Sequence, residues 1–149
     1  MKRSTITILL GLMLTAFASV NFAQEAVVRA PNPVLVFAGA EYFKLDGREL
    51  TRYRYFVFNG ADYPNTMFAP ATDLPPCGSN TKSARTWVDV LDQRGKKLQA
   101  FCNFGSNKDL DSIWFAAPVD ETPPSWIYIE LNDRKTGTKY KSNLAETTL

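Results

Sequence analysis

After its first 23 residues the chain alternates between short runs of β-branched and aromatic residues and clusters of glycine, proline, asparagine and aspartate. Such runs are typical of strands, and such clusters are typical of turns. No segment shows the apolar period of an amphipathic helix. This part of the chain is therefore predicted to be all β. The predicted strands are residues 34–45, 51–59, 85–91, 98–104, 113–116, 126–131 and 138–142.

Two features of the pattern indicate how these strands are arranged. Asp46-Gly47 lies between the first two runs and is a strong signal for a two-residue hairpin turn. In the run 126–131, aliphatic residues alternate with residues that are either aromatic or charged. One side of that strand should therefore be buried and the other exposed. The side predicted to be buried consists of Ile127, Ile129 and Leu131, and the other of Trp126, Tyr128 and Glu130.

Seven short strands in about 120 residues are typical of an antiparallel β-sandwich. We expect an immunoglobulin-like or fibronectin-III-like arrangement, with a small jelly roll or an open barrel as the alternative. Residues 60–84 carry four prolines and are predicted to be a long irregular loop. The chain is predicted to form one domain over 24–149, with a loose tail from about residue 144.

The N-terminal segment, residues 1–23, has the pattern of a cleavable secretory signal. Lys2 and Arg3 precede an apolar run over 6–17 that is short for a transmembrane helix, which needs about 20 residues. We place cleavage after Ala23, with Ala18 as the alternative. The protein is therefore expected to be secreted or periplasmic. No second apolar run approaches spanning length, so no membrane insertion is expected after cleavage.

Charge and composition limit the possible functions. Residues 1–23 contain two of the 17 basic residues and none of the 15 acidic ones, so the remaining 126 residues carry 15 of each and no formal net charge. A neutral domain has no electrostatic basis for binding nucleic acid. The chain has no histidine, which excludes serine–histidine and cysteine–histidine catalysis and most transition-metal sites. We expect no cofactor and no metal site.

The only two cysteines are Cys77 and Cys102. In an oxidising compartment an even pair most simply forms one disulfide. Their separation is far from a C-x-x-C motif, which argues against a redox or metal-binding pair.

Several segments together resemble a family of small secreted proteins of uncharacterised function. They are 74–80 (LPPCGSN), 83–89 (SARTWVD), 101–102 (FC), 114–115 (WF), 133–137 (DRKTG) and 140–143 (YKSN). The resemblance covers residues 34–145. It implies secretion, an immunoglobulin-like sandwich and a Cys77–Cys102 bridge, and it implies no activity, substrate or catalytic residue.

The candidate binding site is an aromatic sheet face. Trp126 and Tyr128 share one side of their strand with Glu130, and Trp87 shares one side of another strand with Asp89. Exposed aromatic rings can stack on sugars or bury themselves in a protein partner. If the two strands are neighbours, Asp89 and Glu130 could also lie at the spacing that glycosidases use. We expect these carboxylates to be solvated or paired with Arg85, Arg134 or Lys139.

Three further patterns have structural interpretations that we favour. Residues 107–111 place oxygen ligands at alternating positions but lack the remainder of a calcium loop, so a turn capped by Asn and Asp is expected. Residues 52–55 interleave arginine with tyrosine, and these arginines are expected to pair with cross-strand acids. The proline-rich loop 65–77 could present a rigid segment to a protease, but the same features serve plain anchoring of the loop, which we favour.

The sequence thus predicts a secreted, non-catalytic module that binds an unknown protein or glycan. A glycan-acting hydrolase using Asp89 and Glu130 is the first alternative. A cell-envelope structural module or a protease inhibitor presenting residues 65–77 is the second.

Overall fold

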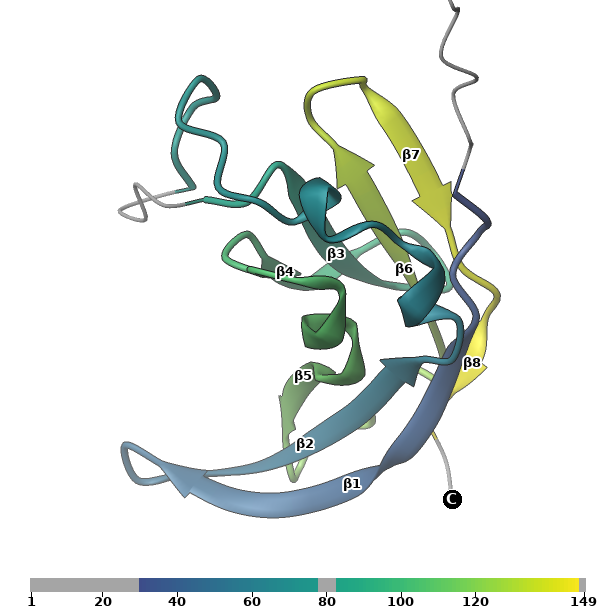
Figure 1. Ribbon diagram of the computed structural model, residues 1–149. Helices are drawn as coiled ribbons and strands as arrows, with labels where there is room; N and C mark the ends of the chain where they lie inside the picture. Colours follow the sequence, from purple (N-terminus) through teal and green to yellow (C-terminus); the bar gives the residue numbers. More distant parts are fainter. Residues whose placement is uncertain (1–29, 78–82, 148–149) are drawn as a thin grey trace, which may run out of the picture.

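The structure is a computed structural model that describes residues 30–77 and 83–147. Two antiparallel sheets pack face to face as a β-sandwich (Figure 1). The first has the order β1-β2-β5, with bounds Leu35–Leu45, Arg48–Val57 and Ile113–Pro118. The second has the order β4-β3-β6-β7, with bounds Lys97–Phe101, Thr86–Asp92, Trp126–Asp133 and Thr138–Lys141. The predicted signal segment and its cleavage site lie outside the described residues.

The strand order identifies the type of sandwich. β4 pairs with β3 in the second sheet and leaves β5 as the edge of the first. This is the fibronectin-III-like variant of the immunoglobulin arrangement, in which β1, β2 and β5 face the other four main strands. The predicted all-β sandwich is therefore confirmed.

The strand β8, Ala145–Glu146, corrects the prediction for the C-terminal tail. It pairs with the beginning of β6, where Ala145 lies opposite Ile127. Ala145 and Thr147 are both buried, because the chain continues along β6 in the direction of β7 after Ser142. Residues 145 and 146 are thus part of the sheet, and the Thr147 amide donates a hydrogen bond to the carbonyl oxygen of Ser125, so this segment is not a loose tail.

The first two strands form the longest hairpin, which curves beyond the body of the sandwich (Figure 1). Asp46 and Gly47 form its turn with φ values of 49° and 79°, as a two-residue turn of type I′ requires. A bulge between Phe37 and Gly39 shifts the register of β1 against β2. A bulge bends a strand and increases its local twist, in agreement with the curvature of this hairpin.

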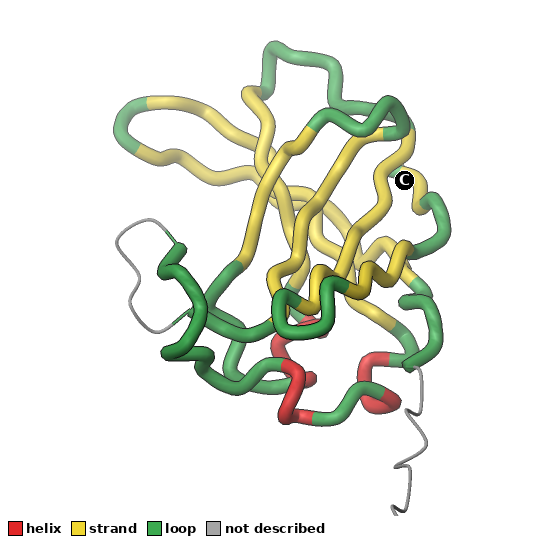
Figure 2. The backbone as a smooth tube through the Cα atoms, turned by 90° about the horizontal axis from the view of Figure 1, so that it is seen from above, coloured by secondary structure: helices red, strands yellow, loops and turns green. Residues whose placement is uncertain are grey.

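The core lies between the sheets and follows the predicted alternation. Ile127, Ile129 and Leu131 of β6 are fully buried, as expected. The irregular segment after β2 also contributes, because Tyr63 and Phe68 are 1% and 0% exposed. Three short 3-10 turns lie at one end of the strands (Figure 2) and help to close the core there. They span Gly60–Asp62, Asn65–Met67 and Asn107–Asp111.

Candidate functional site

The solvent-facing side of β3 and β6 brings together the residues that the sequence singled out. The two strands are antiparallel neighbours, and their register places Asp89 directly opposite Glu130 and Trp87 directly opposite Asn132. Tyr128 lies two residues before Glu130 and therefore projects from the same side. The adjacency that the sequence left open is thus present in the structure.

The three aromatic residues of this face differ in exposure. Trp126, at the beginning of β6, is 40% exposed. Trp87 is only half-buried, whereas Tyr128 is 7% exposed although it points away from the core. The face is therefore not an open aromatic surface, and Trp126 is the ring most available to a ligand.

Cationic side chains cover the two less exposed rings. The guanidinium carbon of Arg134 lies 4.0 Å from the centre of the Trp87 ring. The ammonium nitrogen of Lys141 lies 4.0 Å from the centre of the Tyr128 ring. Both distances are in the range of cation–π attraction. The rings thus serve as platforms that hold charged groups toward the solvent.

Hydrogen bonds fix Arg134 above Trp87. Its guanidinium donates to the carbonyl oxygen of Pro75 at 2.6 Å and to the hydroxyl of Ser83 at 3.4 Å. Pro75 belongs to the loop that the Cys77–Cys102 disulfide ties to the end of β4. The disulfide loop therefore helps to position a cation on the candidate face.

The two carboxylates of the face are both paired with lysines. The Asp89 carboxylate lies 2.9 Å from the Lys97 ammonium and accepts a hydrogen bond from Asn132 at 3.2 Å. The Glu130 carboxylate lies 3.6 Å from the Lys139 ammonium. Their side chains are 16% and 21% exposed, so these pairs are partly shielded from the solvent.

The charges of this face do not balance. Its carboxylates are those of Asp89 and Glu130 and, opposite Trp126 on β8, that of Glu146. Four cations approach it from the neighbouring strands and the turn after β6. These cations belong to Lys97, Arg134, Lys139 and Lys141. The face therefore presents an excess of one positive charge to a ligand, although residues 24–149 together carry no formal net charge.

A buried ion pair at the end of β6 is a feature that sequence reasoning did not find. We expected Arg85 as a possible partner of Asp89 or Glu130, but its guanidinium makes two hydrogen bonds to Asp133, the Nε bond being 2.7 Å long. Burial alone would raise the pKa of the Asp133 carboxyl. The hydrogen bonds from Arg85, Thr136 and the Lys135 amide outweigh burial and lower that pKa below its usual value.

The arginines of residues 52–55 pair with an acid on the neighbouring strand, as expected. The Arg52 guanidinium lies 3.0 Å from the Glu41 carboxylate on the adjacent strand β1, and that of Arg54 lies 3.9 Å from the same residue. Arg52 also stacks over Phe43 and Trp114 at 4.7 and 5.1 Å. These contacts account for the interleaved pattern through pairing within the sheet.

Residues 107–111 form a capped 3-10 turn. The Asp109 carboxylate accepts hydrogen bonds from the amides of Gly105 and Ser106 at 2.7 and 2.9 Å. The Asn107 side chain donates to the carbonyl oxygen of Tyr63 at 2.8 Å. In the part of the chain that the structure describes, no group of three or more acidic or cysteine residues is placed to hold a metal ion.

The loop 65–77 is only partly available as a presented segment. Met67 and Phe68 are 5% and 0% exposed, so the first part of the loop is packed into the core. The predicted disulfide is present, and it joins Cys77 to Cys102 across 25 positions. A protease could reach the exposed residues from Pro70 onward without disturbing the core.

Comparisons with known proteins add no assignment to this geometry. The chain matches no protein-family model, and searches of curated proteins and of solved structures found no match either. No helix in residues 30–77 or 83–147 is long and apolar enough to cross a bilayer.

Proposed function

We propose that the protein is a secreted, non-catalytic binding module whose ligand, a protein or a glycan, docks on the solvent side of β3 and β6. One observation carries this proposal most strongly. The register of the two strands groups Trp87, Asp89, Tyr128 and Glu130 on one face, and Trp126 extends that face as an exposed ring. Aromatic rings beside hydrogen-bonding groups are the combination that sugar and protein ligands use.

The chemistry of the face favours binding over turnover. Asp89 and Glu130 each carry a lysine partner, and the chain contains no histidine to exchange a proton near neutral pH. The cations on Trp87 and Tyr128 would attract the carboxylates, sulfates or phosphates of a ligand.

The proposal can be tested by capture of ligands with the disulfide-bonded protein lacking residues 1–23. A glycan array and a pull-down from the envelope and secreted fractions would be run with the wild type and with Trp126→Ala. Phe58→Ala is the matched control, because Phe58 is 76% exposed at the end of β2 in the other sheet. We expect Trp126→Ala to lose the ligand and Phe58→Ala to retain it. Equal retention by both variants would contradict the proposed face.

A glycan-acting hydrolase is a second candidate, favoured by the direct opposition of Asp89 and Glu130. Opposed residues on antiparallel strands have Cβ atoms about 5 Å apart, which is close to the carboxylate spacing of retaining glycosidases. This candidate requires that polysaccharide turnover be abolished by Asp89→Asn and by Glu130→Gln in proteins that remain folded. A pH–rate profile with one raised pKa would further support it.

A further inference from the structure

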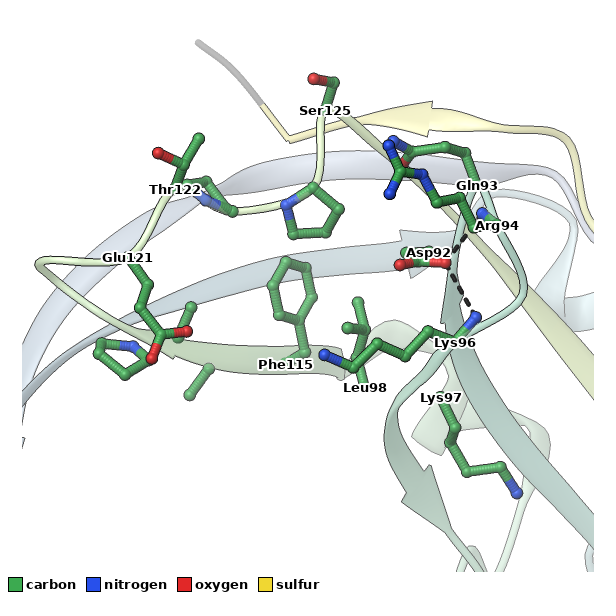
Figure 3. A pocket seen from close by; sticks show the side chains of 15 residues that line it. Asp92, Gln93, Arg94, Lys96, Lys97, Leu98, Phe115, Glu121, Thr122 and Ser125 are labelled. Atoms are coloured by element: carbon green, nitrogen blue, oxygen red, sulfur yellow. Dashed lines mark hydrogen bonds between the residues drawn. The ribbon is translucent and has the colours of Figure 1, made fainter.

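The sandwich is open along one seam, where β4 and β5 lie side by side as the free edges of their two sheets. At one end of the seam, the rings of Phe101 and Trp114 close the gap with their centres 5.8 Å apart. At the other end the strands diverge around a hollow of about 470 Å³ (Figure 3). The β3–β4 turn and the segment between β5 and β6 form its two rims.

The edge of β5 offers backbone hydrogen-bonding groups to this hollow. The amide of Val119 donates to the carbonyl oxygen of Glu49 at 3.2 Å, which identifies this pair as a hydrogen-bonded one. Hydrogen-bonded and non-bonded pairs alternate along an antiparallel ladder. Ala116, opposite Arg52, is therefore at a non-bonded position, and its N–H and C=O point away from β2 toward the seam.

Apolar side chains line part of the hollow, beside its polar rims. Phe115 and Leu98 reach it from the two edge strands (Figure 3). Pro123 and Pro124 line it from the segment before β6. The Phe115 ring stacks on Tyr53 with centres 4.9 Å apart, so this floor is a rigid part of the core. Because Phe115 is only 2% exposed, an apolar side chain of a ligand would be buried mainly against Leu98 and the prolines that line the hollow.

The rim formed by the β3–β4 turn is cationic. Arg94 and Lys96 line the hollow there, and within the described residues neither takes part in an ion pair. The Asp92 carboxylate beside them accepts hydrogen bonds from their two backbone amides at 2.8 and 2.9 Å. Glu121 lies on the opposite rim, so the two rims differ in charge (Figure 3).

We propose that this seam binds an extended peptide segment of a protein partner, which adds to β5 as a further strand. The segment would carry apolar side chains that enter the hollow over Phe115 and acidic side chains that meet Arg94 and Lys96. Addition of a strand to a sheet edge takes its affinity from main-chain hydrogen bonds and its specificity from pockets for alternate side chains. The residues that carry this proposal are distinct from Trp87, Asp89, Tyr128 and Glu130, and Trp126 borders the hollow through a backbone hydrogen bond with Gln93.

A substitution at Ala116 tests the main-chain part of this proposal. Ala116→Pro removes the outward N–H, and proline is tolerated on an edge strand where the N–H faces away from the ladder. Ala116→Val is the matched control, because it enlarges the side chain and keeps the N–H. The probe is a fluorescein-labelled peptide of alternating valine and glutamate as long as β5, which has six residues.

Binding would be measured by fluorescence anisotropy and by NMR shifts of the backbone amides of β5. We expect the peptide to bind the wild type and Ala116→Val, and to bind Ala116→Pro at least about tenfold more weakly, which corresponds to about 1.4 kcal/mol. Lys96→Glu should weaken binding as well. A peptide of alternating valine and lysine should bind less tightly than the acidic one.

A control on the peptide keeps the test decisive if Ala116→Pro fails to fold. Methylation of alternate backbone nitrogens in the valine–glutamate peptide removes its ladder donors and leaves the protein unchanged. Strand addition requires that one of the two methylation patterns abolish binding. Equal binding of both methylated peptides, equal binding to the proline and valine variants, or no binding up to about 1 mM peptide would each overturn the proposal.

Discussion

Replacing Asp133 with asparagine is expected to destabilise the fold substantially, although the two side chains have nearly the same shape. Asp133 is 3% exposed, and its carboxylate accepts both hydrogen bonds from the Arg85 guanidinium. It also accepts hydrogen bonds from the Lys135 amide at 3.0 Å and from the Thr136 hydroxyl at 2.9 Å. The amide of asparagine has only one accepting oxygen, so part of this set loses its acceptor.

The magnitude follows from the burial of the two partners. Removing one partner of a fully buried ion pair costs about 3–5 kcal/mol, because the other charge is left unpaired. The Arg85 side chain is 24% exposed and can recover part of its hydration. We therefore expect Asp133→Asn to lower the free energy of unfolding by about 2–4 kcal/mol.

The same carboxyl should make stability depend on pH in a defined direction. Its folded-state pKa is lowered from the ordinary 3.8, so the folded protein binds the proton less readily than the unfolded chain does. The stability that Asp133 supplies is then fully present above the unfolded-state pKa and is lost as pH falls through the folded value. Asp133→Asn should remove this part of the acid dependence.

Urea denaturation followed by tryptophan fluorescence, at neutral pH and at several acidic values, measures both effects. Asp120→Asn is the matched control, since Asp120 is exposed and its change is expected to lie within about 0.5 kcal/mol of zero. If Asp133→Asn changed stability as little as Asp120→Asn does, or left the acid slope unaltered, the assigned role of the ion pair would be wrong.

Three other variants have expected outcomes that the same assay can check. The Tyr55 hydroxyl is buried without a hydrogen-bond partner in the described part of the chain, so Tyr55→Phe should be neutral or stabilising. Tyr63 is equally buried and its hydroxyl donates a hydrogen bond to the carbonyl oxygen of Pro31. Tyr63→Phe should therefore lower the free energy of unfolding by about 1 kcal/mol. Equal effects of the two changes would contradict this assignment. Replacing both Cys77 and Cys102 by serine should lower the free energy of unfolding by about 3–4 kcal/mol, because the disulfide closes a loop with a separation of 25 residues. An unchanged urea midpoint would argue against this contribution of the disulfide.

The strand pattern could be predicted because it depends on local chemistry. Alternation in 126–131 placed Ile127, Ile129 and Leu131 in the core, and Asp46-Gly47 predicted the hairpin turn. β8 was missed because two residues, Ala145 and Glu146, are too short a run to show alternation. Its pairing with β6 depends on a tertiary contact that no local pattern encodes.

Pairing between distant segments limited the prediction of the site. The sequence identified the face of Trp87 and Asp89 and the face of Tyr128 and Glu130, but not that β3 and β6 are neighbours. Long-range register is set by the whole sheet, since a slip of one residue would reverse every side chain. The Arg85–Asp133 pair spans 48 positions and was missed for the same reason.

The exposure of the aromatic residues depended on an even longer chain of contacts. Trp87 is covered because Arg134 lies on its ring, and Arg134 is held there by the carbonyl oxygen of Pro75. Pro75 in turn lies two residues before Cys77, whose disulfide fixes the loop to the end of β4. Loss of the disulfide should therefore release Arg134 and uncover Trp87, so the covalent bond that stabilises the fold also shapes its proposed binding face.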